Sequence, residues 1–126
     1  MQVSKQGVNK RVEKKVFRSF YQVLADIKNP QVMEKFFSDI LSPTERAVLA
    51  KRLAIAHYLR QNKSYDVIKN DLKVSSATIA TIQSWLEQGN EGLNIALKAI
   101  EADEWAGDLA DKISATVHSW FKTSSK

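Results

Sequence analysis

Apolar residues recur every three or four positions along most of this chain, the spacing that places them on one face of an α-helix. The first such series consists of Val12, Val16, Phe20, Leu24 and Ile27. No segment shows the apolar–polar alternation of a half-buried β-strand, and no hairpin dipeptide joins two such segments. The pattern therefore predicts an all-α fold, a helical bundle of about seven helices.

Residues that cap helices mark where the predicted helices start and end. The clearest start is the stretch SPTE at 42–45, where Ser42 and Glu45 form a capping box around a proline at the first helical position. Ser64 can cap a later helix, Ser75 or Ser76 the one after it, and Gly89 ends that one. The expected helices cover about residues 12–28, 32–41, 43–61, 64–72, 75–88, 91–105 and 108–121, the last two separated at Gly107.

The periodicity also predicts which side chains are buried. In helices 43–61, 64–72 and 75–88 these are Val48, Leu49, Leu53, Ala56 and Leu59, then Val67, Ile68 and Leu72, then Ile79, Ile82 and Leu86. In the last helix the stripe is Leu109, Ile113, Val117, Trp120 and Phe121. The tryptophans Trp85, Trp105 and Trp120 fall near these stripes, which favours a place in the core or an interface.

Length and composition indicate one domain. At 126 residues the chain can bury one core but is short for two, so we expect residues 12–126 to form a single domain. It contains no cysteine, which excludes disulfides and thiolate metal sites and is typical of a reducing compartment. No apolar run approaches the roughly 18 residues of a membrane span, and the N-terminus lacks an apolar signal-peptide core. We therefore expect a cytoplasmic protein.

Positive charge is concentrated near the N-terminus. The net charge is +5, and residues 1–18 alone hold six basic groups against one acidic group. We expect residues 1–11 to be a flexible basic arm. Residues 42–73 carry a second excess, of seven cations over three anions. Blocks of one sign suit a polyanionic partner, although a solubilising tail and solvated helix faces would explain the same counts.

Residues 64–88 have the pattern of a helix-turn-helix. Ile68 and Leu72 of the first short helix face inward. Ile79 and Ile82 of the second can pack against them, while Val74 fills the turn. The outward positions of the second helix are small or hydrogen-bonding, so this face can enter a major groove about 12 Å wide. These positions are Ser75, Ser76, Ala77, Thr78, Ala80, Thr81, Gln83 and Ser84.

The stretch LSPTERAVLAKRLAIAHYLRQNKSYDVIKNDLKVSSATIATIQSWL, residues 41–86, resembles the Trp repressor family. The likeness lies in the capped helix opening, the ER…L…R pattern, the S…IKNDL of the first helix and the ATI of the second. The resemblance implies an interlocked all-helical homodimer, in which two recognition helices enter successive major grooves of a palindromic operator in double-stranded DNA. The helix predicted at 108–121 has no counterpart in the short repressors, and we expect it to pack on the N-terminal helix or across a dimer.

These observations predict which residues meet DNA. Lys69 and the outward residues at 75–84 are expected to touch bases or nearby phosphates. Residues 64–88 hold two cations and three anions, so the backbone phosphates must be neutralised mainly by other parts of the chain. The expected phosphate contacts are Arg46, Lys51, Arg60, Lys63 and Lys73, with Lys5, Lys10 and Arg11 of the arm. Because only Gln83, serines and threonines can read base edges, we expect water-mediated contacts and DNA shape to contribute much of the specificity.

The chain departs from the family at the turn and at the corepressor pocket. Lys73 stands where such turns have glycine, so the turn is either strained or differently shaped. The resemblance implies a pocket at Arg52 and Ser42, in which two arginines hold an indole and its carboxylate. Arg52 matches the first arginine, but Thr81 replaces the second, and Ile82 replaces the small residue after it. We therefore expect that tryptophan is not a corepressor here.

The sequence contains no catalytic constellation. His57 and His118 have no evident nucleophile or second metal ligand, and no glycine-rich phosphate loop occurs, so we predict no enzyme activity, metal or cofactor. One alternative function is a helical protein–protein adaptor that has lost DNA binding, with an aromatic interface. The residues of that interface would be Phe36, Phe37, Trp105, Trp120 and Phe121. Binding of the basic N-terminal helix to a membrane surface is a further alternative.

Overall fold

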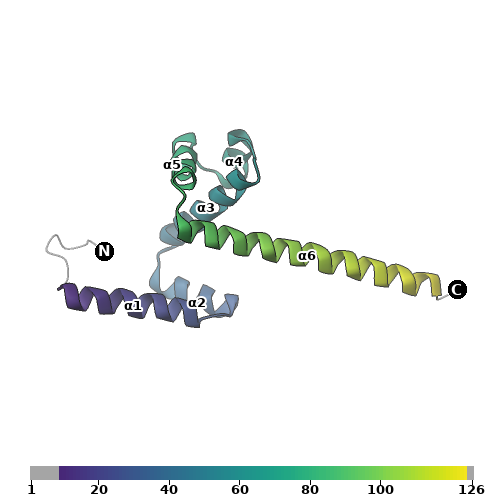
Figure 1. Ribbon diagram of the computed structural model, residues 1–126, viewed down its shortest axis with the longest axis horizontal. Helices are drawn as coiled ribbons and strands as arrows, with labels where there is room; N and C mark the ends of the chain where they lie inside the picture. Colours follow the sequence, from purple (N-terminus) through teal and green to yellow (C-terminus); the bar gives the residue numbers. More distant parts are fainter. Residues whose placement is uncertain (1–8, 125–126) are drawn as a thin grey trace. The chain divides into compact units, whose positions relative to one another are not determined.

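The computed structural model describes the backbone of residues 9–124 and the side chains of residues 9–104, 106, 107 and 111. Within the described part the fold is all-α, without strands (Figure 1). The helices are α1 (Lys10–Asp26), α2 (Pro30–Ile40), α3 (Pro43–Arg60), α4 (Tyr65–Leu72), α5 (Ser76–Glu87) and α6 (Glu91–Ser124). No helix among these residues is both long and apolar enough to cross a membrane.

The fold has one helix fewer than the sequence predicted. The separation expected at Gly107 is absent, since α6 continues through this residue and joins the helices predicted at 91–105 and 108–121. A single glycine lowers helix stability by only about 1 kcal/mol relative to alanine. Gly107 followed by Asp108 allows a helix to end and another to start, but no proline is present to enforce the break.

Side-chain caps confirm the predicted start of α3 and place the start of α2 at Pro30, two residues before the predicted one. At α3 the backbone N–H of Ser42 donates to Glu45 Oε1 at 2.8 Å, and the N–H of Glu45 donates to Ser42 Oγ at 3.1 Å. This reciprocal pair is the predicted capping box, and the bond from the Ser42 N–H lowers the pKa of Glu45. At α2, Asn29 Oδ1 accepts from the N–H groups of Gln31 and Val32, with Pro30 at the first helical position.

Two residues of the predicted basic arm are helical. Lys10 and Arg11 belong to α1, whose start is capped by Asn9 Oδ1 accepting from the Arg11 N–H at 3.0 Å. The rest of the predicted arm, including Lys5, lies outside the described residues.

The chain divides into two compact units, Met1–Val48 and Leu49–Lys126. In the first unit, neither α1 nor α2 contains a buried residue. Large apolar side chains are instead exposed on it: Val12, Val16, Phe17, Phe20, Tyr21, Val23, Val32, Ile40 and Val48. The described part of the first unit, residues 9–48, thus has apolar faces but no buried core of its own.

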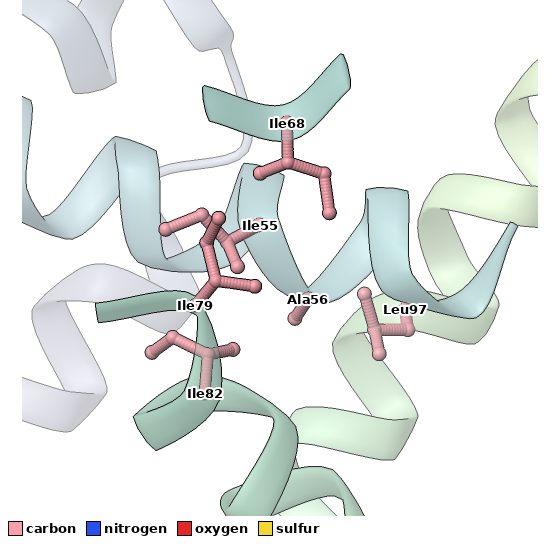
Figure 2. Close-up of a cluster of buried hydrophobic side chains, with 6 residues drawn as sticks. All are labelled: Ile55, Ala56, Ile68, Ile79, Ile82 and Leu97. Atoms are coloured by element: carbon pink, nitrogen blue, oxygen red, sulfur yellow. The ribbon is translucent and has the colours of Figure 1, made fainter. Parts of the chain in front are cut away.

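The core lies in the second unit. Figure 2 shows the six apolar side chains that are buried among the described residues, which come from α3, α4, α5 and α6: Ile55, Ala56, Ile68, Ile79, Ile82 and Leu97. Half-buried side chains pack around them: Tyr58, Leu59, Tyr65, Leu72, Val74, Trp85, Leu86, Leu93 and Ile100. This cluster holds α4 and α5 on the second half of α3 and the first turns of α6.

The predicted burial is confirmed around this cluster and wrong on part of α3. Ala56, Ile68, Ile79 and Ile82 are buried, and Leu59, Leu72 and Leu86 are half-buried, as expected. Four side chains expected inside are exposed instead: Val48, Leu49, Leu53 and Val67. Periodicity identifies an apolar face, but it does not say whether that face is covered by the same chain or by another molecule.

Candidate nucleic-acid interface

The helix-turn-helix consists of α4 and α5, and a serine caps each helix. Ser64 Oγ accepts from the Val67 N–H at 3.3 Å, and Ser75 Oγ accepts from the Thr78 N–H at 3.2 Å. These bonds satisfy N–H groups that have no partner within a helix. The two starts therefore follow directly from the serines in the sequence.

The turn between the helices is strained, one of the two outcomes that the sequence allowed. Lys73 adopts left-handed backbone angles, with φ 54° and ψ 57°, where glycine is usual. A side chain in this region costs on the order of 1 kcal/mol. The Lys73 N–H donates to the Lys69 carbonyl at 2.9 Å, and the Lys51 ammonium donates to the Lys73 carbonyl at 3.4 Å. Val74 follows, half-buried against the core.

The outward face of α5 is open in the described part of the chain. Ile79 and Ile82 are buried on the opposite side of the helix. The acidic Glu87 is exposed in the last turn of α5. The exposed positions before it are Ser75, Ser76, Ala77, Thr78, Ala80, Thr81 and Ser84. We call these seven residues the recognition face. It carries no charge, and only hydroxyl and methyl groups project from it.

Several hydroxyls of the recognition face already have partners within the protein. Ser75 Oγ and Thr78 Oγ1 lie 3.0 Å apart, and Thr81 Oγ1 donates to the Ala77 carbonyl at 3.1 Å. Ser84 Oγ accepts from Gln88 Nε2 at 3.4 Å. Each hydroxyl retains hydrogen-bonding capacity, because a hydroxyl has one donor and two acceptor positions.

Gln83 differs from the outward position that the sequence predicted. It is half-buried, its Oε1 accepts from the Tyr65 hydroxyl, and its Nε2 donates to Glu87 Oε1 at 3.4 Å. The reason is helical geometry, because Gln83 lies four residues after Ile79 and therefore on nearly the same side of α5. Gln83 thus links α5 to α4 rather than presenting its amide to a base. No feature of the sequence marks Tyr65 as its partner.

The predicted phosphate-binding cations occupy different environments. Lys69, Lys73 and Lys63 are exposed, and the Lys63 ammonium lies 4.8 Å from the centre of the Tyr58 ring. Lys51 is half-buried beside the turn. Arg60 is paired, with its Nε 3.3 Å from Glu101 Oε1 and its Nη1 donating to Asn94 Oδ1 at 2.7 Å. The negative charge of Glu101 therefore partly neutralises Arg60, which we expected to contact a phosphate.

Arg46 and Ser42, in the first unit, form hydrogen bonds with residues close to them in the sequence. Arg46 is half-buried and its Nη1 donates to Ser38 Oγ at 2.8 Å. Ser42, predicted as a pocket residue, has its N–H and its hydroxyl in the capping box with Glu45. Both groups therefore have a structural role at the start of α3.

Arg52, the other predicted pocket residue, contacts an indole that belongs to the chain itself. Its guanidinium carbon lies 5.8 Å from the centre of the Trp85 ring, within the range of a cation–π interaction. Trp85 is half-buried and packs against the core, while Arg52 is exposed. The sequence predicted Trp85 in a core or interface, but nothing in it indicated the pairing with Arg52.

Comparisons with known proteins agree with this fold. The sequence pattern of the family described as Trp repressor protein matches residues 15–101. The uncharacterized protein YerC of Bacillus subtilis (strain 168) is 29% identical over 97 residues, which cover 77% of this chain and 92% of YerC. A crystal structure described as that of a candidate Trp repressor from Staphylococcus aureus superimposes with a TM-score of 0.65 at 23% identity. The match covers 74% of this chain and 96% of that one.

Proposed function

Because this chain belongs to the Trp repressor protein family, we propose that it is a repressor-like transcriptional regulator that binds specific sites in double-stranded DNA. In this proposal it acts as a homodimer and reads DNA through the helix-turn-helix of α4 and α5. The observation that carries the proposal is the open, uncharged recognition face on a helix whose other side is anchored in the core.

The chemistry of the recognition face favours a particular way of reading DNA. α5 contains no lysine or arginine, so the common arginine–guanine contact is not available to it. Alanine and threonine methyl groups suit the methyl group of thymine, and serine and threonine hydroxyls accept or donate to several base edges. We propose that much of the specificity comes through bridging waters and through the shape of the DNA.

The proposed backbone contacts come from cations around the helix-turn-helix. Lys69 and Lys73 flank the turn, Lys51 contacts it, and Lys63 precedes α4. Each of these side chains can neutralise one phosphate, whereas Arg60 is already paired with Glu101. The cations of the N-terminal segment, among them Lys10 and Arg11, would supplement this set.

Exposed apolar surface supports the homodimer. Leu49 and Leu53 of α3 are 48% and 37% exposed, and Phe20 of α1 is 40% exposed. Exposed apolar helix faces of this kind are unfavourable in water and mark interaction sites. A second copy of the chain would bury them, as the family's architecture implies. Two copies would also place two recognition faces along one duplex, which suits a palindromic site.

The absence of a tryptophan corepressor is also part of the proposal. Ile82 is 2% exposed in the core with Ile79, at the position where the resemblance implies a small residue beside the indole. Thr81 provides no cation for a ligand carboxylate. We therefore propose that the protein binds DNA without tryptophan.

Selection of bound duplexes from a random library tests this function. A palindromic consensus with half-sites about one helical turn apart would support both DNA reading and two-fold symmetry. Recovery of no enriched sequence would contradict the proposal and favour the adaptor alternative.

A further inference from the structure

The recognition helix is attached to its neighbours at two points outside the core. On one side, Gln83 accepts from the Tyr65 hydroxyl and joins α5 to α4. On the other, Trp85 lies under the Arg52 guanidinium and joins α5 to α3. Tyr65 and Trp85 both pack against the buried cluster, so each attachment borders the core.

These two attachments lie on opposite flanks of the buried stripe of α5. Successive helical residues are rotated by about 100°, so the order around the helix is Trp85, Ile82, Ile79 and Gln83. A helix held only by its central stripe can roll about its own axis. Contacts on both flanks prevent that roll, and they fix the direction in which the recognition face points.

The contact on the Trp85 flank depends on a cation with no other partner among the described residues. The side chains that contact carboxylates there are His57 and Arg60, and no hydrogen bond of Arg52 is found in that part of the chain. Trp85 has the largest side chain of α5 and lies next to Thr78 and Thr81 around the helix. Its position therefore directly affects the recognition face.

We infer that Trp85 serves as a built-in ligand of the helix-turn-helix. Its indole, packed on the core and held by Arg52, sets the roll of α5 and keeps the recognition face presented without any small molecule. The consequence for DNA rests on the proposed function, whereas the setting of α5 does not. Removal of this half-buried indole would leave an open recess between the core and Arg52, with the shape of a flat bicyclic aromatic.

The test is Trp85→Gly in the full chain, with free indole as the probe. Amide hydrogen exchange in α5 should become at least about tenfold faster, because the helix is held on one flank only. Affinity for the duplex recovered by selection should fall by a similar factor. Millimolar indole should slow the exchange and restore most of the affinity, while leaving the wild-type protein unchanged. The inference would be overturned if amide exchange in α5 of the variant were as slow as in the wild type. It would also be overturned if indole did not reverse the reduction in affinity.

A matched variant separates this role from general packing. Leu86→Ala removes apolar packing from the same helix and the same core without touching Arg52, so indole should not reverse its effects. Reversal by indole in this variant would show a non-specific effect and contradict the inference.

If Trp85→Gly does not fold, Arg52→Gln tests the inference instead, because Arg52 is exposed and its replacement leaves the core intact. Exchange in α5 should then rise about threefold, and an unchanged rate would overturn the inference. Amide exchange is measured without DNA, so the role of Trp85 and the proposed DNA binding are tested independently of each other. If selection recovers no duplex while α5 still responds to Trp85→Gly and to indole, only the DNA-binding proposal fails.

Discussion

The ammonium group of Lys51 lies 3.4 Å from the carbonyl oxygen of Lys73, the residue that turns the chain between α4 and α5. Lys73 has left-handed backbone angles, so its carbonyl leaves the path of α4 and points toward α3. The contact ties the strained turn to the helix that carries the core residues Ile55 and Ala56. The turn is therefore held by a lysine of α3, and lysine is also the residue type that we propose to contact DNA phosphates.

Replacing Lys73 separates backbone strain from charge. Lys73→Gly should stabilise the protein by about 1 kcal/mol, because glycine adopts the left-handed region without steric conflict. Lys73→Ala should give no such gain, since alanine retains a Cβ. Both variants remove a cation, so both should flatten the salt dependence of DNA binding by roughly 1 unit for the one phosphate that Lys73 would neutralise. Denaturant titration and binding at several salt concentrations measure the two effects, and equal stability of the two variants would contradict the strain.

Gln83 should contribute to the stability of the fold, and Thr78 to the discrimination between DNA sites. Gln83→Ala and Tyr65→Phe should each lower the free energy of unfolding by about 1 kcal/mol, and the double variant should be little less stable than either one. Thr78→Ala should leave stability nearly unchanged and reduce discrimination between the selected site and random DNA, at an unchanged salt slope. Unfolding curves and competition binding measure these effects. Additive effects for Gln83 and Tyr65, or an equal fall in affinity for both duplexes with Thr78→Ala, would contradict these roles.

The capping box of α3 should make stability depend on pH. The bond from the Ser42 N–H lowers the pKa of Glu45 below its ordinary value of 4.5. A lowered folded-state pKa means that the stabilisation is fully present above the unfolded value and disappears as the pH falls through the folded value. The stability difference between the wild type and Glu45→Gln should thus be constant above about pH 5.5 and shrink below pH 4.5.

Thermal unfolding at a series of pH values measures this difference. Glu34→Gln, at an exposed glutamate of α2, serves as a control for the removal of one negative charge. A difference between wild type and Glu45→Gln that does not change between about pH 3 and 6 would contradict the role of the Glu45 carboxylate.

The exposed face of α3 should be the dimer interface. In sedimentation equilibrium the wild type should have twice the chain mass of 14.2 kDa. Leu49→Glu should shift it to the monomer mass, because a charge buried without a partner costs several kcal/mol. Gln31→Glu, which adds the same charge at an exposed polar position of α2, should leave the mass unchanged. A monomeric wild type would contradict the homodimer.

Features fixed by neighbouring residues could be predicted from the sequence, and features fixed by distant residues could not. Ser42, Ser64 and Ser75 cap helices because their hydroxyls bond N–H groups three residues ahead, and such spacing is visible in the sequence. The pairing of Arg52 with Trp85 joins two different helices, so no local pattern contains it.

Two errors have the same physical origin in tertiary structure. Periodicity predicts that Leu49 is buried, whereas its side chain is 48% exposed among the described residues. Gln83 was assigned to the outward face by its polarity, whereas its position relative to Ile79 placed its side chain beside Tyr65. The residue type indicates which interactions a side chain can form, and its position on the helix determines which neighbours it contacts.

The central claim is that the recognition face of α5 binds specific DNA, and affinity measured against salt concentration tests it most directly. Fluorescence anisotropy with the selected duplex and with a random duplex should give two lines of log affinity against log salt. Both lines should fall as phosphate contacts are screened, with the selected duplex bound at least about a thousandfold more tightly at physiological salt. No measurable binding, or equal affinity for the two duplexes, would contradict the claim.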